Sequence, residues 1–241
     1  MSANNKNVEI EIQRQYYTET AHQYEGMHLS DKDEHFFALS VLVGLLDYLE
    51  IKTILDIGSG TGRAITYIKG KKPNIHIIGI EPVQELREVA YRQGLSNNEL
   101  IQGDGMNLQF GDKEFDLVCE FGVLHHVKYP NIVVSEMLRV ARKAIFISDS
   151  NNFGQGSWLA RQVKQAINLL GLWKVADFLK TKGKGYTISE GDGLSYSYSV
   201  FDNYKQLQKV CHSLHIINTK NAHINPYKTA DHVAILGLKS N

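Results

Sequence analysis

The residue types and spacing most able to do chemistry lie in a glycine-rich turn between an apolar run and a helical pattern. Residues 54–63 read ILDIGSGTGR, so Gly58, Gly60 and Gly62 stand at alternate positions after a predicted strand. Glycine admits backbone angles closed to other residues and lets a ligand approach the main chain. The amide groups at the helix start favour partial negative charge. The turn predicts a nucleotide-binding corner, with a glycine turn of no functional meaning as the alternative.

The spacing of these glycines narrows the class of ligand. A dinucleotide site has the pattern G-x-G-x-x-G, whereas this turn is G-x-G-x-G preceded by Asp56, which weakens a pyrophosphate-binding interpretation. The stretch LDIGSGTGR resembles motif I of the class I S-adenosylmethionine-dependent methyltransferases. The resemblance implies that the loop, including Asp56 and Ser59, wraps the methionine part of S-adenosyl-L-methionine, whose demethylated product is S-adenosyl-L-homocysteine.

An acidic residue directly follows the next predicted strand, which covers residues 75–80. Glu81, followed by Pro82, stands about 20 positions beyond the turn, the separation typical of a ribose-binding acid. A carboxylate at that place accepts two charge-assisted hydrogen bonds from a ribose diol. We therefore predict that Glu81 binds the ribose and that Pro82 lies beside it, with a solvated helix-start carboxylate as the alternative.

A second acid follows the predicted strand 100–103. Asp104, with Gly105 and Met106 behind it, resembles the acid of this family that receives the adenine amine. Met106 would supply an apolar contact to the ring. The alternative for Asp104 is an Asx-type turn before a short helix.

Further family motifs follow in order along the chain. Residues 115–127, including Glu120 and Phe121, match the segment that passes beneath the transferring methyl group, and EMLRV at 136–140 resembles a helix end of the type 11, small-molecule branch. Tyr17 and Tyr24 resemble the tyrosine pair that closes over the methionine end of the cofactor. For these two tyrosines simple helix packing is the alternative.

Two adjacent histidines, His125 and His126, are the candidate catalytic residues. They follow the fourth predicted strand, where the switch point of a doubly wound sheet opens a crevice. A neutral histidine suits the role of general base toward a hydroxyl acceptor at neutral pH. A structural or cofactor-contact role is the alternative. The weaker candidates are His28, His35 and His223. The chain has ten histidines, so some of them are expected near any cleft by chance.

The elements that must position these residues alternate between strand and helix. Continuously apolar strands are typical of a parallel sheet covered on both faces, and the pattern predicts a doubly wound, mostly parallel, seven-stranded α/β sheet of the Rossmann-like class. Strands are expected at 53–57, 75–80, 100–103, 115–120, 144–149, 215–219 and 232–238, with helices at 62–69, 83–93, 131–140 and from 199 to 211. We expect an N-terminal helical cap over residues 1–50 and a core over 51–241.

The regular alternation is interrupted over residues 151–198. Leu159, Val163, Ile167, Leu170 and Trp173 recur at helical spacing there, and the helical pattern is weakened at Gly171. We interpret this stretch as an inserted helical lid above the sheet. Its aromatic residues would build an apolar or aromatic acceptor pocket: Trp158, Tyr186, Tyr196 and Tyr198. The alternative is a helix that packs its apolar stripe on the domain, followed by a polar loop.

Composition limits the partners that the chain can have. Its 26 basic and 26 acidic residues cancel, so no net positive field gathers nucleic acid. No apolar run approaches the length of a membrane-spanning helix, which predicts a cytoplasmic protein without a membrane partner. Cys119 and Cys211 suit buried reduced thiols, and we assign no metal ligands. The sequence leaves monomer and homodimer undecided.

Together these features predict methyl transfer from S-adenosylmethionine to an oxygen or nitrogen of a small-molecule metabolite or natural product. The reaction would be an in-line displacement at the sulfonium methyl, in which positioning supplies most of the catalysis. Two alternatives remain. One is a non-catalytic nucleoside-binding module of the same fold, and the other is an NAD-dependent oxidoreductase, which the glycine spacing disfavours.

Overall fold

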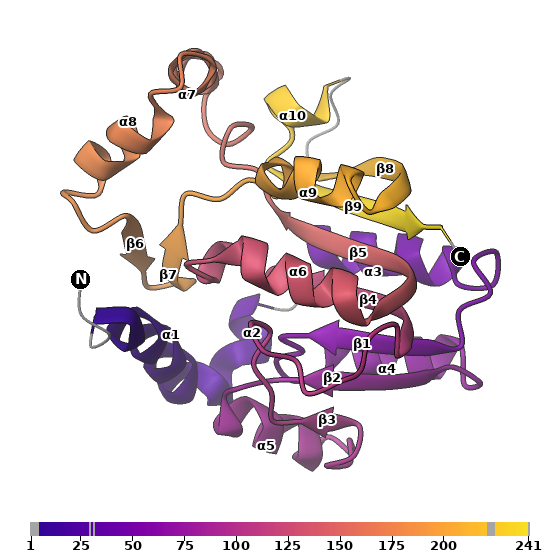
Figure 1. Ribbon diagram of the computed structural model, residues 1–241. Coiled ribbons are helices and arrows are strands. Elements are labelled where there is room, and N and C mark those ends of the chain that lie inside the picture. The colour runs from indigo at the N-terminus through magenta and orange to yellow at the C-terminus, as the bar shows by residue number, and fades with distance from the viewer. Residues whose placement is uncertain (1–4, 29, 31, 221–224, 241) are drawn as a thin grey trace.

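A twisted seven-stranded sheet forms the centre of the protein (Figure 1). The computed structural model describes residues 5–28, 30, 32–220 and 225–240. The strand order is β3-β2-β1-β4-β5-β9-β8, in which β1 to β5 run parallel and β9 runs antiparallel to both of its neighbours. The strands are β1 (Thr53–Ile57), β2 (His76–Ile80), β3 (Leu100–Ile101), β4 (Phe115–Phe121), β5 (Ala141–Ser150), β8 (Cys211–Lys220) and β9 (His232–Lys239). The prediction of a mostly parallel seven-stranded sheet is confirmed.

Helices cover both faces of this sheet, which is why its strands are apolar throughout. One buried cluster joins Leu55 and Val118 to α6 (Pro130–Val140) and α9 (Tyr204–Gln208). A second cluster joins alternate strand residues, such as Ile54, to the helices of the opposite face. Those helices are α3 (Glu34–Leu45), α4 (Arg63–Lys71) and α5 (Gln84–Arg92), and short helical turns lie at η2 (Leu124–His126), η3 (Val200–Asn203) and α10 (Pro226–Thr229).

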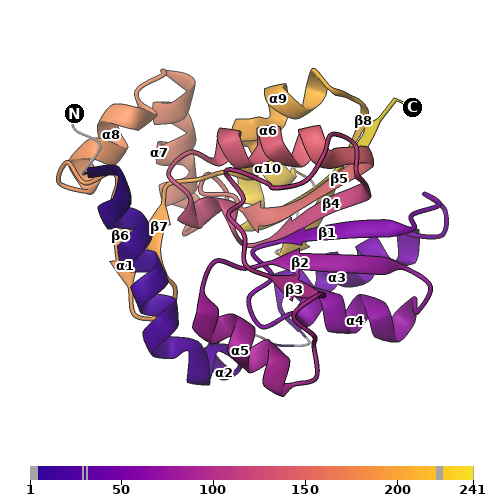
Figure 2. The same cartoon turned by 60° about the horizontal axis from the view of Figure 1, so that its bottom comes forward.

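The N-terminal helices occupy two different positions in the fold. The helix α3 belongs to the core, with Leu42 fully buried, whereas Phe37 of the same helix is 50% exposed. Ahead of it, α1 (Asn5–Thr20), η1 (Ala21–Gln23) and α2 (Tyr24–His28) lie outside the sheet layers (Figure 2). There α1 contacts α5 and β7. Only α1 to α2 therefore have the position expected of a cap.

The stretch 151–198 contains two helices and a hairpin that stand out from the sheet (Figure 1). The expected long helix is broken at Gly171, whose φ of +72° ends α7 (Trp158–Leu169) before α8 (Trp173–Lys180) begins. The polar sequence behind α8 forms the two-stranded sheet of β6 (Tyr186–Ser189) and β7 (Gly193–Tyr196). Among the described residues, no helix is both long and apolar enough to cross a bilayer.

Candidate active site

A cavity of about 380 Å³ lies at the carboxyl ends of β1, β2 and β4 and is covered by α1. The register of the sheet brings this edge together, since Ile57 pairs with both Ile80 and Glu120. Eleven of the residues predicted from sequence line it: Tyr17, Tyr24, Gly58, Glu81, Pro82, Asp104, Gly105, Met106, Phe121, His126 and Tyr196. Five others predicted as cofactor ligands do not: Asp56, Ser59, Gly60, Gly62 and Glu120. We call this space the cofactor cavity.

The glycine turn forms one wall and is shaped by close packing. Gly60 has a φ of +57°, and a Cβ there would lie 2.8 Å from the Tyr24 hydroxyl. A Cβ on Gly62, at φ +84°, would lie 2.2 Å from Leu95 Cδ1. Any larger residue at either position would therefore strain the backbone and displace a neighbour.

Asp56 lies beneath this turn rather than in the cavity. Its side chain is buried, and burial is the main cause that raises its pKa to about 7. The Ser59 hydroxyl donates to the Asp56 carbonyl oxygen over 3.1 Å. Both residues thus hold the shape of the loop in this structure.

Glu81 is placed as a ribose ligand requires. One of its carboxylate oxygens accepts a hydrogen bond from the Gly60 amide (3.0 Å) and the other from the Val83 amide (2.9 Å). Each oxygen keeps lone-pair capacity for a hydroxyl donor from the cavity side. Burial is the main cause that raises the Glu81 pKa to about 6. Each oxygen of this buried carboxylate accepts only one hydrogen bond from the described residues, so the group can also accept the hydroxyls of a nucleoside diol.

Asp104 combines the two roles considered for it. Its Oδ1 accepts from the Met106 amide at 2.9 Å, which is an Asx turn, while Oδ2 lies 3.5 Å from the Arg14 guanidinium of α1. The side chain lines the cavity and is 42% exposed. It can therefore form the turn and still accept a hydrogen bond from an exocyclic amine.

Glu120 is fully buried behind the cavity wall. Its Oε2 accepts from the Val123 amide at 2.8 Å. Burial, reinforced by the neighbouring Asp149 carboxylate, raises the Glu120 pKa well above its usual range. In this position it supports the loop after β4.

A second cavity, of about 220 Å³, lies under the stretch 151–198, and we call it the acceptor cavity. Tyr186, Tyr196 and Tyr198, three of the residues expected to build an acceptor pocket, line this cavity, whereas Trp158 lines neither cavity and is 67% exposed. Much of the wall is polar, including Asp177, Lys180, Thr181, Thr187, Asp192, Ser195 and Ser197. The wall is thus more polar than the aromatic pocket that the sequence suggested.

The two candidate histidines stand between these cavities. The rings of His125 and His126 lie 3.9 Å apart, with His125 lining the acceptor cavity and His126 the cofactor cavity. Asp192, from the β6–β7 turn, reaches both, at 3.4 Å from His125 Nε2 and 3.5 Å from His126 Nε2. Tyr196 lines both cavities. A reacting group could meet a cofactor methyl at this border.

His125 is held in its protonated form. Burial alone would lower its pKa, but the carboxylate of Asp149, 2.7 Å from Nδ1, and that of Asp192 together raise it to about 10. The pKa of each carboxyl is lowered in turn, against the effect of burial, by the histidine charges. At neutral pH His125 is therefore a donor, which is unsuited to accept a proton.

His126 has a different environment. Its Nδ1 lies 2.7 Å from the Leu194 carbonyl oxygen and 3.1 Å from Gln13 Nε2, and we assign it as the donor in the shorter of these two contacts. In the neutral ring Nε2 is then the acceptor, and the Tyr17 hydroxyl lies 3.1 Å from it. The geometry leaves His126 able to take a proton at Nε2.

Three residues of this site were missed by sequence reasoning. Gln13 of α1 accepts from the Leu194 amide and donates to the Asp192 carbonyl oxygen at 3.3 Å, which ties α1 to the hairpin. Asp149 could have been found, because it ends a predicted strand at the same sheet edge. Nothing in the sequence signals Gln13 or Asp192, since their roles depend on distant segments.

Replacing Asp192 with asparagine tests the charge arrangement at this border. We expect the His125 pKa to fall below the value of about 10 and to stay above 6.5, because Asp149 still contacts Nδ1. An NMR pH titration of the imidazole signals measures it. Asp177→Asn is the matched control, since Asp177 lines the same cavity. An unchanged His125 titration in Asp192→Asn would contradict the arrangement.

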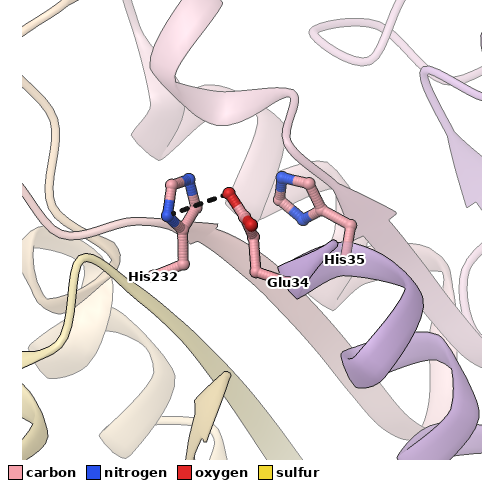
Figure 3. A group of neighbouring side chains, drawn as sticks. All are labelled: Glu34, His35 and His232. Carbon is pink, nitrogen blue, oxygen red and sulfur yellow. Dashed lines mark ion pairs between the residues drawn. The ribbon is translucent and has the colours of Figure 1, made fainter. Parts of the chain in front are cut away.

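A second group, Glu34, His35 and His232, lies between α3 and β9, and its His232 also lines the acceptor cavity (Figure 3). Glu34 Oε1 lies 3.3 Å from His232 Nδ1 and 3.2 Å from Lys220 Nζ, and His35 Nδ1 lies 3.1 Å from Ser148 Oγ. Burial lowers the pKa of both histidines, that of His35 to about 4. Since the lysine already neutralises the carboxylate, we read the group as a contact between elements.

The other two weaker histidine candidates, the side chain of His28 and the whole of His223, lie outside the described residues.

The fold and site define a Rossmann-like nucleoside-binding protein of the class I methyltransferase type. Residues 55–147 match a type 11 family model described as "Methyltransferase domain". The structure is similar to that of magnesium protoporphyrin IX methyltransferase from Synechocystis PCC 6803 with bound SAH, with a TM-score of 0.62 and 16% identity over 96% of this chain and all of that one. Residues 55–147 therefore match a methyltransferase domain family, and the resemblance recognised in the sequence, with the S-adenosylmethionine cofactor it implies, is borne out.

Curated relatives match the same part of the chain. Demethylmenaquinone methyltransferase of Thermotoga maritima is 32% identical over 77 residues, covering 32% of this chain and 33% of its own length. Norajmaline N-methyltransferase of Rauvolfia serpentina is 35% identical over 95 residues, 37% of this chain and 32% of its own. The chain spans only about a third of the length of these relatives. Both relatives are named as methyltransferases, which favours this class over an NAD-dependent oxidoreductase. Their names indicate different acceptors, so they do not identify the acceptor of this chain.

Proposed function

We propose that the protein transfers a methyl group from S-adenosylmethionine to an oxygen or nitrogen of a small polar molecule bound in the acceptor cavity. The observation that carries the proposal is the border between the two cavities. Tyr196 lines both of them, and of the adjacent pair of histidines, His125 lines the acceptor cavity and His126 the cofactor cavity. This arrangement also distinguishes the proposal from a nucleoside-binding module, which needs no second cavity.

The residues of the cofactor cavity are suited to hold the parts of the cofactor. Glu81 would bind the ribose, Asp104 the adenine amine, and Tyr17 and Tyr24 the methionine end. When bound, S-adenosylmethionine supplies an electrophilic methyl group on a sulfonium centre. The faces of the tyrosines favour that cation. The positive charge of the sulfonium disperses in the transition state, so groups that stabilise this charge favour the bound cofactor rather than the transition state. Alignment of the acceptor with the methyl group therefore contributes more to the rate.

We assign the general-base role to His126 and a positioning role to His125. With Nδ1 donating to Leu194, His126 presents Nε2 to an acceptor hydroxyl or ammonium. His125, charged between Asp149 and Asp192, would donate a hydrogen bond toward the acceptor cavity when Asp192 moves aside. A base is needed only for an acceptor that starts protonated.

The chemistry of the acceptor cavity favours a hydrogen-bonding molecule. Asp177, Lys180 and the hydroxyls of Ser195 and Ser197 offer both donors and acceptors. We further propose that the hairpin β6–β7 is the part of the expected lid over 151–198 that closes this cavity. Its link to α1 through Gln13 would close both cavities together and exclude water from the transfer.

Replacing His126 with glutamine tests the assignment. We expect turnover to fall by about 10²–10⁴-fold while cofactor affinity changes by no more than about threefold, because only proton transfer is lost. Formation of S-adenosylhomocysteine is measured across a panel of hydroxyl- and amine-bearing acceptors, and cofactor affinity by calorimetry. His125→Gln is the companion variant, expected to raise KM more than it lowers kcat. Unchanged turnover in both variants would overturn the role of the pair.

A further inference from the structure

The helices α7 and α8 present apolar faces to solvent. Neither helix has a buried residue. Leu159 and Val163 of α7 and Leu170 at its C-terminal end are 64%, 50% and 71% exposed. Their spacing of four and seven residues puts them on one face of the helix. A surface helix ordinarily turns such a face toward the core.

The polar face of α7 is the one that contacts the protein. Lys164 Nζ donates to the Asn152 carbonyl oxygen, Gln165 Nε2 to the Phe153 carbonyl oxygen at 3.0 Å, and Asn168 Nδ2 lies 3.0 Å from the Tyr227 hydroxyl. The helix is therefore inverted relative to an ordinary surface helix. The alternative in which the apolar stripe packs on the domain therefore fails for Leu159, Val163 and Leu170. Ile167 and Trp173 of the stripe are half-buried, and the Trp173 ring packs against Phe153.

The next helix repeats this inversion. Val175, Phe178 and Leu179 of α8 are 58%, 58% and 71% exposed, whereas Asp177 and Lys180 line the acceptor cavity. Both helices stand beyond one end of the sheet, outside the α/β body (Figures 1 and 2). The exposed apolar side chains of the pair are Trp158, Leu159, Val163, Leu169, Leu170, Leu172, Val175, Phe178 and Leu179. A patch of this kind marks an interaction surface.

Positive charge is concentrated on the same segment. Residues 156–185 hold six basic residues, Arg161, Lys164, Lys174, Lys180, Lys182 and Lys184, against one acidic residue, Asp177. The whole chain, with 26 of each, has no net charge. Lys174, Lys182 and Lys184 are exposed in or directly after the helix pair.

We infer that α7 and α8 dock the protein onto an anionic lipid bilayer, with the apolar residues inserted among the headgroups and the lysines on the lipid phosphates. Exposed Trp, Phe and Leu beside Lys are typical of helices that lie in a membrane interface. A second copy fits less well, because a two-fold contact through this face would oppose two segments of like charge. This inference departs from the expectation of no membrane partner, which rested on the lack of an apolar run long enough to span a bilayer.

Vesicle co-sedimentation of the full-length protein tests this inference without any assay of methyl transfer. One set of vesicles is pure phosphatidylcholine, and the other contains about 30% phosphatidylserine, which supplies the negative surface potential. We expect binding to the anionic vesicles and at least about tenfold weaker binding to the neutral ones. Binding should weaken as salt is raised.

Double variants test whether the vesicles bind through the exposed face of α7 and α8. Leu159→Ser with Leu170→Ser removes apolar contact, and Lys182→Glu with Lys184→Glu reverses charge. Each pair is expected to weaken binding by about tenfold or more, since each buried apolar group and each lysine contributes. The matched controls are Val210→Ser with Ile216→Ser and Lys205→Glu with Lys209→Glu, exposed residues elsewhere on the surface. The control pairs should bind as the parent protein does.

Three outcomes would overturn the inference. They are no binding to anionic vesicles, equal binding by the helix variants and their controls, and a homodimer in sedimentation velocity that Leu159→Ser with Leu170→Ser dissociates. The last outcome would assign the face to a second copy of the chain. Since all four residues are exposed on the surface, the variants should fold, and circular dichroism checks it.

Discussion

Replacing Asp149 with asparagine is expected to lower the free energy of unfolding by about 3–5 kcal/mol at neutral pH, the usual cost of removing one partner from a buried ion pair. Asp149 is fully buried, and its Oδ1 lies 2.7 Å from Nδ1 of the protonated His125. Its Oδ2 also accepts from the Leu124 amide at 2.7 Å. In the asparagine variant, Asp192 is the one carboxylate of this pair that still contacts the His125 charge.

The pH dependence of this loss follows from the two pKa shifts. The pKa of His125 is raised from 6.5 to about 10 by folding, so its contribution to stability is full below 6.5 and is lost as pH rises toward 10. The pKa of Asp149 is lowered from 3.8, so its contribution is present above that value and is lost in acid. The difference between parent and variant should therefore be larger at about pH 6 than at about pH 9.

Urea unfolding at both pH values measures the difference. Asp112→Asn is the control, because Asp112 is 77% exposed and its pair with Arg139 contributes less than about 1 kcal/mol. The double variant His125→Gln with Asp149→Asn removes both charges and should recover part of the loss, which a double-mutant cycle quantifies. A loss below about 1 kcal/mol, or one that is equal at both pH values, would contradict the ion pair.

Replacing Glu81 with glutamine is expected to weaken S-adenosylmethionine binding by about a hundredfold or more. Hydrogen bonds to a charged group contribute about 1.5–3 kcal/mol each, and the carboxylate would accept two from the ribose. The glutamine amide also offers a donor where the Gly60 and Val83 amides need acceptors. The glycine turn and the ribose contact are thus disturbed together.

Isothermal titration calorimetry with S-adenosylmethionine and S-adenosylhomocysteine measures this effect. Glu99→Gln is the matched control, because that carboxylate pairs with Lys69 and does not line the cofactor cavity. Both ligands lose affinity to a similar degree, since they share the ribose. Affinities within about threefold of the parent protein would remove Glu81 from the site.

Local sequence rules were enough to predict the sheet and eleven of the residues that line the cofactor cavity. Gly58, Glu81 and Asp104 follow the ends of parallel strands, and the carboxyl ends of such strands meet at one edge of the sheet. The same rules could not separate the residues that line the cavity from those that support it. Asp56 and Glu120 lie as close to the motifs as Glu81 does, yet burial beneath the loops turns them away.

The sequence by itself determined the strand–helix alternation, the glycine turn and the cofactor class, because each depends on residues close together in the chain. Tertiary structure decided the charge of His125, which depends on Asp149 and Asp192 from separate segments. It also decided which face of α7 meets the protein. Periodicity defines an apolar stripe, but only the polar partners at Asn152, Phe153 and Tyr227 turn that stripe outward.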